Sequence, residues 1–383
     1  MKKLFIAFAA VALVAAFATT SVAGDWNFYG SARVSLWSLD TDNGAGRSEK
    51  DTKFQLQNNS RLGARVRGKD LYGRFEFGIN PEADNQAPFG NGGNSISTSV
   101  QSSSVYLRLL YGVWDFGAGK LVVGQDYTPI YMGVSNANTA SGSDSVMIGW
   151  GVVYDRSAQI RLEFGGLQLA LVDNTGFNVL TGAVAGTTTE MTLPRIDAKY
   201  TFKFDPVKFD IVGSYFSYSM ERPALADLSV DSYLFGARGD AMLGPVRLRG
   251  AIDWTQNGTQ LGVSGGGSAA LANAGGANAS VIDNDAMGFA LTGLWKLNDM
   301  FQFEAGYGYV ENEMDDAAMP PIAGGSGATQ EDDRSMYYLQ SVITMAPGVY
   351  IVPEIGVQDG KSNAAGTSDG DMTYWGAKFQ IDF

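Results

Sequence analysis

The sequence predicts an all-β protein, a transmembrane antiparallel β-barrel of sixteen strands. Three observations lead to this prediction. The chain ends on an amphipathic strand, the same two-residue alternation recurs in sixteen segments, and the connections between these segments alternate between short and long. Together they are the pattern of an outer-membrane barrel, with short periplasmic turns and long outer loops.

The end of the chain is the clearest strand. From Trp375 onward, apolar or small side chains alternate with polar or small ones, and one face carries Trp375, Ala377, Phe379, Ile381 and Phe383. Period two is the β-strand period. An exposed apolar edge would promote aggregation of a soluble domain, but a strand that closes a barrel in lipid leaves no such edge. We expect this strand to pair with the segment that starts at Trp26.

Polar and apolar side chains alternate in the same way along the rest of the chain, least clearly at 101–125. An even number of strands would place both termini on the periplasmic side. The sixteen predicted segments are 26–39, 52–68, 71–80, 101–111, 117–125, 151–164, 166–172, 192–204, 206–218, 230–243, 246–256, 286–297, 300–310, 334–345, 348–358 and 372–383.

The predicted connections differ in length. Short links with turn-forming residues occur at 69–70, 205–206, 244–245, 298–299 and 346–348. The long, Gly-, Asn-, Ser- and Asp-rich connections are 40–51, 81–100, 126–150, 173–191, 257–285, 311–333 and 359–371. The glycine-rich run from Gly265 to Gly267 could be an interdomain linker. Strand patterns of the same type resume on both sides of it, which favours the tip of a loop.

The N-terminus has the pattern of a secretory signal peptide. Met1-Lys2-Lys3 is a basic start, residues 4–17 are apolar, and Ser21-Val22-Ala23 is a small-residue cleavage pattern. The alternative is an uncleaved anchor, but the apolar run is shorter than the roughly 20 residues of a spanning helix. We therefore divide the chain into a signal peptide, residues 1–23, and a barrel, residues 24–383.

Composition excludes several functions. Removal of Lys2 and Lys3 leaves 25 basic and 40 acidic residues, so the mature chain carries a net charge of −15, which argues against a nucleic-acid partner. The chain has no cysteine and no histidine. It therefore lacks thiolate metal sites and the commonest metal ligand and general base, and we expect no cofactor. Segments at Asp40–Gly44 and Asp283–Asp285 lack the glutamate that completes a calcium loop.

Several motifs, in order along the whole mature chain, resemble those of the general porins of Gram-negative outer membranes. They are Phe28-Tyr29-Gly30, Asn59-Ser60-Arg61-Leu62-Gly63, Gly73-Arg74-Phe75-Glu76-Phe77, Gly124-Gln125-Asp126-Tyr127-Thr128, Tyr154-Asp155-Arg156-Ser157, residues 350–356 and the terminal Phe383. The resemblance implies a sixteen-stranded homotrimer whose third loop folds into the lumen. It also implies that the barrel-assembly machinery recognises the last strand, so Phe379, Ile381 and Phe383 are the candidate assembly signal.

The charges predict a basic wall beneath acidic loops. Acidic residues crowd the long loops, as at 311–316 and 331–333, so the net negative charge is not spread evenly. By alternation, the polar faces of the strands carry the acids Glu76, Glu163, Asp197, Asp210, Asp240, Asp253, Glu304 and Glu354. The same faces carry the bases Arg33, Arg61, Arg65, Arg67, Arg74, Arg161, Arg195, Lys199, Lys203, Arg238, Arg247, Arg249 and Lys378.

The resemblance implies a constriction where wall arginines oppose carboxylates on the third loop. Arg61 and Arg156 match two of these arginines, Gln125 stands where a third is usual, and Ser31 stands near a common lysine position. The loop is poor in acid, and its candidates are Asp126 and Asp144. We therefore expect a weak charge split and a weak ion preference. The full set of candidates is Arg33, Arg61, Arg65, Arg74, Gln125, Asp126, Asp144 and Arg156.

The first functional prediction is a water-filled channel for passive diffusion of small hydrophilic solutes and ions. The alternatives are a channel selective for sugars or organic acids, which would need an aromatic or binding ladder, and a structural or adhesive barrel. A lipid-hydrolysing barrel enzyme is disfavoured because its serine would need a histidine base.

Overall fold

The computed structural model describes residues 24–42, 44, 48–80, 104–139, 144–174, 180, 186–191, 193–264, 266–273, 276–314, 331–361 and 370–383. The expected signal peptide lies outside these residues. None of the described residues belongs to a helix long and apolar enough to cross a membrane.

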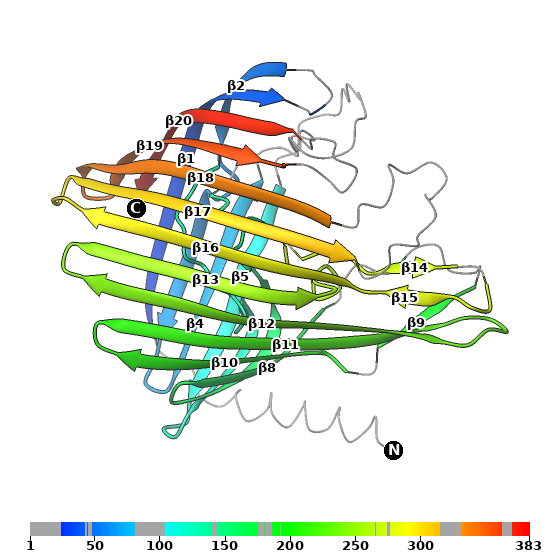
Figure 1. Cartoon of the computed structure of the whole chain (residues 1–383). Helices are drawn as coiled ribbons and strands as arrows, with labels where there is room; N and C mark the ends of the chain where they lie inside the picture. Colours follow the sequence, from blue (N-terminus) through cyan, green and yellow to red (C-terminus); the bar gives the residue numbers. More distant parts are fainter. Residues whose placement is uncertain are drawn as a thin grey trace.

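The described part of the chain is built from β-strands (Figure 1). Their bounds are β1 Asp25–Asp42, β2 Ser48–Leu56, β3 Arg61–Arg67, β4 Leu71–Asn80, β5 Ser104–Asp115, β6 Lys120–Tyr127, β7 Arg156–Phe164, β8 Leu167–Val172, β9 Thr188–Glu190, β10 Arg195–Phe204, β11 Val207–Glu221, β12 Leu228–Leu243, β13 Val246–Gln256, β14 Ala270–Ala272, β15 Ser280–Ile282, β16 Asn284–Lys296, β17 Phe301–Met314, β18 Glu331–Ala346, β19 Val349–Asp359 and β20 Asp371–Asp382.

Apart from the small β14–β15 hairpin, these strands form one closed antiparallel barrel. The barrel closes where β20 pairs with β1, in a register that places Ser31 opposite Asp382. Two strands of the barrel are each interrupted and so consist of two segments. β2 and β3 both pair with β1, and β9 and β10 both pair with β11. The barrel therefore has sixteen strands, and the predicted fold is confirmed.

Two predicted strands differ in their bounds for local reasons. The segment 52–68 is interrupted at 57–60, where a turn brings the amide of Ser60 to the carbonyl of Gln57 at 2.9 Å. The predicted strand 151–164 begins only at Arg156, because the residues before it belong to the long connection from β6. Asp126, predicted to lie in that connection, is part of β6.

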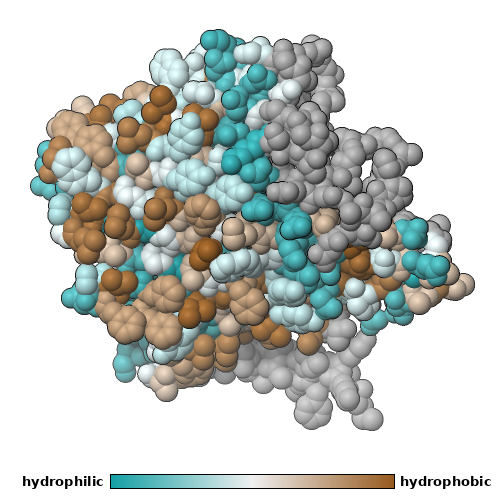
Figure 2. Space-filling model, in the orientation of Figure 1, coloured by the Kyte–Doolittle hydropathy of each residue, from teal (hydrophilic) through white to brown (hydrophobic). Residues whose placement is uncertain are grey.

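The outward faces of the strands are apolar. Phe28, Trp375, Trp254 and Leu291 are each more than half exposed, and Figure 2 shows apolar residues spread over the strands, with hydrophilic residues nearer the loops. In a soluble barrel this surface would be a large aggregation-prone patch. In lipid it is the face that a transmembrane barrel presents.

The connection 128–155 between β6 and β7 reaches the opposite wall from within. The hydroxyl of Thr292 on β16 donates to the carbonyl of Val134 at 2.6 Å, and Glu304 on β17 accepts a hydrogen bond from the amide of Asn136 at 2.8 Å. Both wall side chains are buried and point inward. Residues 134–136 of this connection therefore lie inside the barrel.

Part of the interior is apolar, which the sequence did not predict. Ile130 and Met132 of the connection 128–155 belong to a buried cluster that includes Phe216, Met220 and Leu234 on the inner faces of β11 and β12. The expectation of a polar interior is wrong on this side. Around Tyr215 and Phe216, both faces of β11 carry large apolar or aromatic side chains, so alternation alone does not reveal the second apolar face.

Candidate functional site

A cavity of about 540 Å³ lies within the barrel and is lined by residues that do not belong to the apolar cluster. Side chains of β1, β3, β5 to β7 and β18 to β20 line it, together with residues of the connection 128–155. Its lining residues are Arg33, Asn58, Asn59, Arg61, Tyr106, Arg108, Tyr127, Tyr131, Asn136, Asp144, Val146, Ile148, Tyr154, Arg156, Gln340, Val342, Tyr350, Val352, Lys378, Gln380 and Asp382.

The cavity is positively charged although the chain as a whole is acidic. Its lining carries two carboxylates, Asp144 and Asp382, against the five cations Arg33, Arg61, Arg108, Arg156 and Lys378. The described lining therefore has a formal charge of +3. Local charge and pore radius, rather than the net charge of the whole chain, decide how a lumen acts on ions.

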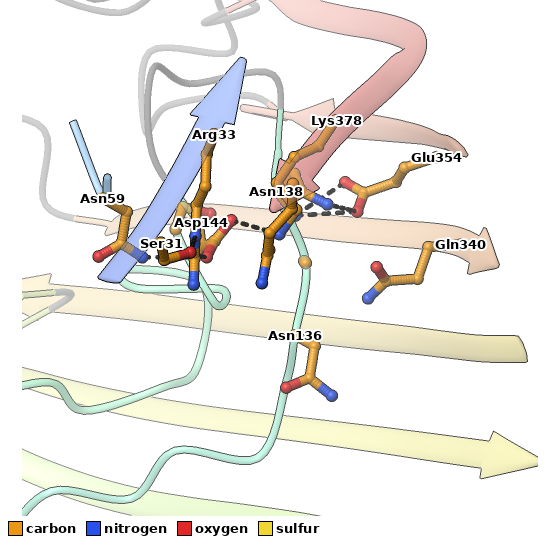
Figure 3. Close-up of polar contacts among 12 residues, drawn as sticks. Ser31, Arg33, Asn59, Asn136, Asn138, Asp144, Gln340, Glu354 and Lys378 are labelled. Carbon is orange, nitrogen blue, oxygen red and sulfur yellow. Dashed lines mark hydrogen bonds and ion pairs between the residues drawn. The ribbon is translucent and has the colours of Figure 1, made fainter. Parts of the chain in front are cut away.

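Asp144 brings together three residues of the barrel wall (Figure 3). Its carboxylate accepts hydrogen bonds from Nζ of Lys378 at 2.7 Å, from Nδ2 of Asn59 at 3.0 Å and from Nη1 of Arg33. Burial alone would raise the pKa of Asp144, but Lys378 and Arg33 lower it more, and the pKa lies below its usual value. Asp144 is therefore ionised at neutral pH, and its single negative charge is shared between two wall cations.

Glu76 holds a second group of wall cations. Its buried carboxylate accepts from Nε of Arg108 and from Nη2 of Arg74, both at 2.7 Å, and lies 3.5 Å from Nη1 of Arg61. One carboxylate shared among three arginines leaves a positive excess. Arg61 is the most weakly paired of the three, and about a quarter of its side chain is exposed.

The remaining cation, Arg156, lies beside a tyrosine cluster. Its guanidinium carbon is 5.8 Å from the ring centre of Tyr154, and its Nη1 has no hydrogen-bond partner among the described residues. The rings of Tyr127 and Tyr131 stack with centroids 4.6 Å apart, and Tyr154 meets both edge-on. Burial raises the pKa of Tyr131 to about 12, so its hydroxyl stays neutral.

Two wall carboxylates hold the backbone of the connection 128–155. Glu304 accepts from the amide and side chain of Asn136 at 2.8 and 2.6 Å. Glu354 accepts from the amides of Asn138 and Thr139, both at 2.9 Å, and Figure 3 shows it facing Asn138. Charge-assisted hydrogen bonds of this kind are strong where water is excluded, so they fix the position of the connection.

The structure brings only some of the predicted candidates together. Arg33, Arg61, Asp144 and Arg156 line the same cavity, whereas the other four lie outside its lining. Gln125 donates to the carbonyls of Leu107 and Arg108 at 3.0 and 3.1 Å, so its amide is used within the wall.

The other three candidates have partners elsewhere. Asp126 pairs with Arg161 at 3.0 Å on the inner face of β6 and β7. Arg74 donates to Tyr29 at 2.7 Å as well as to Glu76. Arg65 lies over the ring of Tyr29 at 5.4 Å and lines a pocket at the short-turn end of the barrel.

Arg108 is a lining residue that sequence reasoning missed. The register between β4 and β5 shifts between Glu76 and Phe77, so that Arg108 has no directly opposed partner in the ladder. A bulge of this kind places two successive side chains on nearly the same side, and both Arg108 and Leu109 are buried. This explains why the alternation is unclear in 101–111.

Comparisons with known proteins agree on the fold. No family model matches the chain, and no curated protein matches it. Among solved structures, the outer membrane channel DcaP of Acinetobacter baumannii is similar, with 18% identity, 95% of this chain and 99% of that chain covered, and a TM-score of 0.66. A trimer form of OmpT, an outer membrane protein of Vibrio cholerae, has 16% identity, coverage of 94% and 99%, and a TM-score of 0.55.

A third similar structure is an anion-selective porin from Comamonas acidovorans, with 13% identity, coverage of 94% and 100%, and a TM-score of 0.53. At these identities the likeness concerns the fold. The chain therefore has the fold of outer-membrane porins, a closed sixteen-stranded antiparallel barrel.

Proposed function

We propose that the protein is a porin of the outer membrane, a water-filled channel through which small hydrophilic solutes and ions diffuse passively. Residues 1–23 direct its export, and the mature barrel assembles as a homotrimer. The constriction is the cavity lined by Arg33, Arg61, Arg156 and Asp144. Solutes cross down their own gradient, with no cofactor and no conformational cycle.

The excess of cations in the cavity lining is the observation that supports the proposal. It also leads us to propose that the channel prefers anions to cations. A lumen with this lining lowers the energy of an anion and raises that of a cation within a few ångströms of the guanidinium groups. The preference for anions is stronger than the sequence alone led us to expect, because Arg108 and Lys378 were not among the predicted constriction residues.

A channel selective for organic acids is the second candidate, because the cavity has an aromatic face. Tyr106, Tyr127, Tyr131 and Tyr154 share the lining with Arg108 and Arg156, and these two arginines contact Tyr106 and Tyr154. A solute with a carboxylate and an apolar body would contact both kinds of side chain. A nonselective sieve needs no such pairing.

Conductance of the purified protein in planar bilayers tests the channel, and the reversal potential in a KCl gradient tests the anion preference. Liposome swelling then separates the two candidates. A sieve admits neutral sugars and organic acids according to size alone, whereas a selective channel admits an organic acid faster than a sugar of equal size. A protein that inserts as a folded trimer and passes no current would refute both.

A further inference from the structure

A second connection also packs into the barrel. Residues 257–264 and 266–269, between β13 and β16, form a compact segment that we call the hook. The buried side chain of Gln260 holds it together, accepting from the amide of Ala269 at 3.2 Å and donating to Oγ of Ser268 at 3.0 Å. The amide of Thr259 reaches the carbonyl of Gly267 at 3.1 Å. The hook is therefore an ordered element with its own hydrogen-bonded frame.

The tip of the hook is anchored to the inner wall. Nη1 of Arg195 donates to the carbonyl of Leu261 at 2.6 Å, and Nδ2 of Asn174 donates to the carbonyl of Gln260 at 2.8 Å. Arg195 is 1% exposed and also pairs with Asp197 on its own strand and with Asp155 of the connection 128–155. One guanidinium thus joins the barrel wall to both inward connections.

Apolar side chains of the hook belong to the buried cluster inside the barrel. Leu261 and Val263 are buried at 0% and 3% exposure in the same cluster as Met132 of the connection 128–155 and Phe216 and Val230 of the wall. Side chains this closely packed leave no passage for water. The hook residues do not line the described cavity, whose lining includes Tyr131, whereas the adjacent Ile130 and Met132 belong to the cluster.

From these contacts we propose that the hook is a second pore-narrowing element. The hook fills the outer part of the lumen against β10 to β13. It thereby confines the water path to the side of β1, β3, β5 and β18 to β20. Through Arg195 it also holds the connection 128–155 in place. The size limit of the channel is then set by two connections together. The inference rests on the proposed channel function.

Deletion of the hook is the direct test. Gln256 and Asp285 are directly opposed at the ends of β13 and β16, so residues 258–283 can be replaced by Asn-Gly, the preferred two-residue hairpin turn. If water refills this half of the lumen, the single-channel conductance rises roughly twofold, and sugars excluded by the wild type enter liposomes. Wild-type conductance and size limit in the folded trimer would overturn the inference.

A matched deletion leaves the hook in place. Leu271 and Val281 are opposed in the β14–β15 hairpin, so replacing residues 272–280 with Asn-Gly shortens the same connection beyond the hook. This variant keeps the wild-type conductance. An increase equal to that of the larger deletion would show that the hook is not the narrowing element.

A point variant provides a test that does not depend on the folding of the deletion variant. Gln260→Ala removes the internal hydrogen bonds of the hook without altering the barrel wall, and it should raise the conductance and the open-channel noise. Ser268→Ala removes only one contact of the Gln260 side chain and should have a smaller effect. Unchanged values for Gln260→Ala in a folded trimer count against the inference. If the wild type itself carries no current, the channel proposal fails first, so the two failures are distinguishable.

Discussion

Nζ of Lys378, on the closing strand of the barrel, donates to Oδ1 of Asp144 at 2.7 Å, although the two residues are 234 positions apart. This ion pair joins the connection 128–155 to the seam where β20 meets β1. It also places the carboxylate of Asp144 in direct contact with the wall cations, so the two kinds of charge do not face each other across an open lumen. Counted with Asp382, this carboxylate leaves the lining with a formal charge of +3.

Asp144→Asn should increase the preference for anions. It removes the charge that compensates Arg33 and Lys378, and a unit charge about 7 Å from an ion in water is worth about 0.6 kcal/mol. The anion gains this energy and the cation loses it, so the anion-to-cation permeability ratio should rise by up to roughly sevenfold, measured as a reversal potential in a KCl gradient. Glu190→Gln, at an exposed carboxylate on β9, is the control and should leave the ratio unchanged.

Arg61→Ala should have the opposite effect. Arg61 is partly exposed to the cavity and only weakly paired with Glu76, so its loss removes positive charge from the water path while Arg74 and Arg108 still hold Glu76. The same salt-gradient measurement should give a permeability ratio lowered by up to roughly sevenfold. A value identical to that of the wild type would remove Arg61 from the constriction.

Glu354→Gln should loosen the connection 128–155. The carboxylate accepts from two backbone amides, and a glutamine has only one oxygen and adds a donor that faces those amides. Leaving a buried amide unpaired costs about 1–3 kcal/mol. We expect noisier open-channel current and closure at lower voltage, with trimer yield largely kept. Quiet, wild-type traces would argue that other contacts, such as those of Glu304, suffice.

The ion pairs of Asp144 should persist to acid pH. Because the pKa of Asp144 is lowered by Lys378 and Arg33, the stabilisation is fully present above the ordinary value of about 3.9 and is lost as pH falls through the lowered value. Reversal potentials should thus be constant between pH 8 and pH 5. The wild type should approach Asp144→Asn only below about pH 3.9, and convergence of the two already near pH 6 would contradict this assignment.

Deletion of Phe383 should lower trimer yield far more than single-channel conductance. The amide and carbonyl of Phe383 exchange hydrogen bonds with Gly30 at 3.0 and 2.6 Å, so the last residue closes the seam. Its ring is largely exposed on the outer surface and is not part of the cavity lining. Heat-modifiability on gels measures assembly, and bilayer recording measures the channels that form. Normal assembly would leave Phe383 as an apolar surface residue only.

Much of the fold follows from local patterns. Alternation along each strand reports which face meets lipid, so the sixteen strands, their order and the pairing of the last strand with β1 could be predicted. Arg33, Arg61, Asp144 and Arg156 were predicted as constriction candidates, and they share one cavity. That they form the constriction stays a prediction.

Other features depend on contacts that alternation does not encode. The inward aim of Arg108 depends on a bulge between β4 and β5, and Gln125 is drawn away from the cavity by carbonyls of the neighbouring strand. The apolar part of the interior depends on Met132 and Leu261, which come from two different connections and belong to one cluster with side chains of β11 and β12.

The sequence by itself determined the barrel, because the requirement to hydrogen-bond every backbone group within lipid leaves few alternatives to alternating strands in a closed sheet. Only the tertiary structure decided the shape and charge of the water path. These depend on how two long connections, which carry no periodic pattern, fold back into the barrel. Their positions are set by long-range ion pairs and buried apolar contacts, such as Asp144 with Lys378 and Arg195 with Asp155.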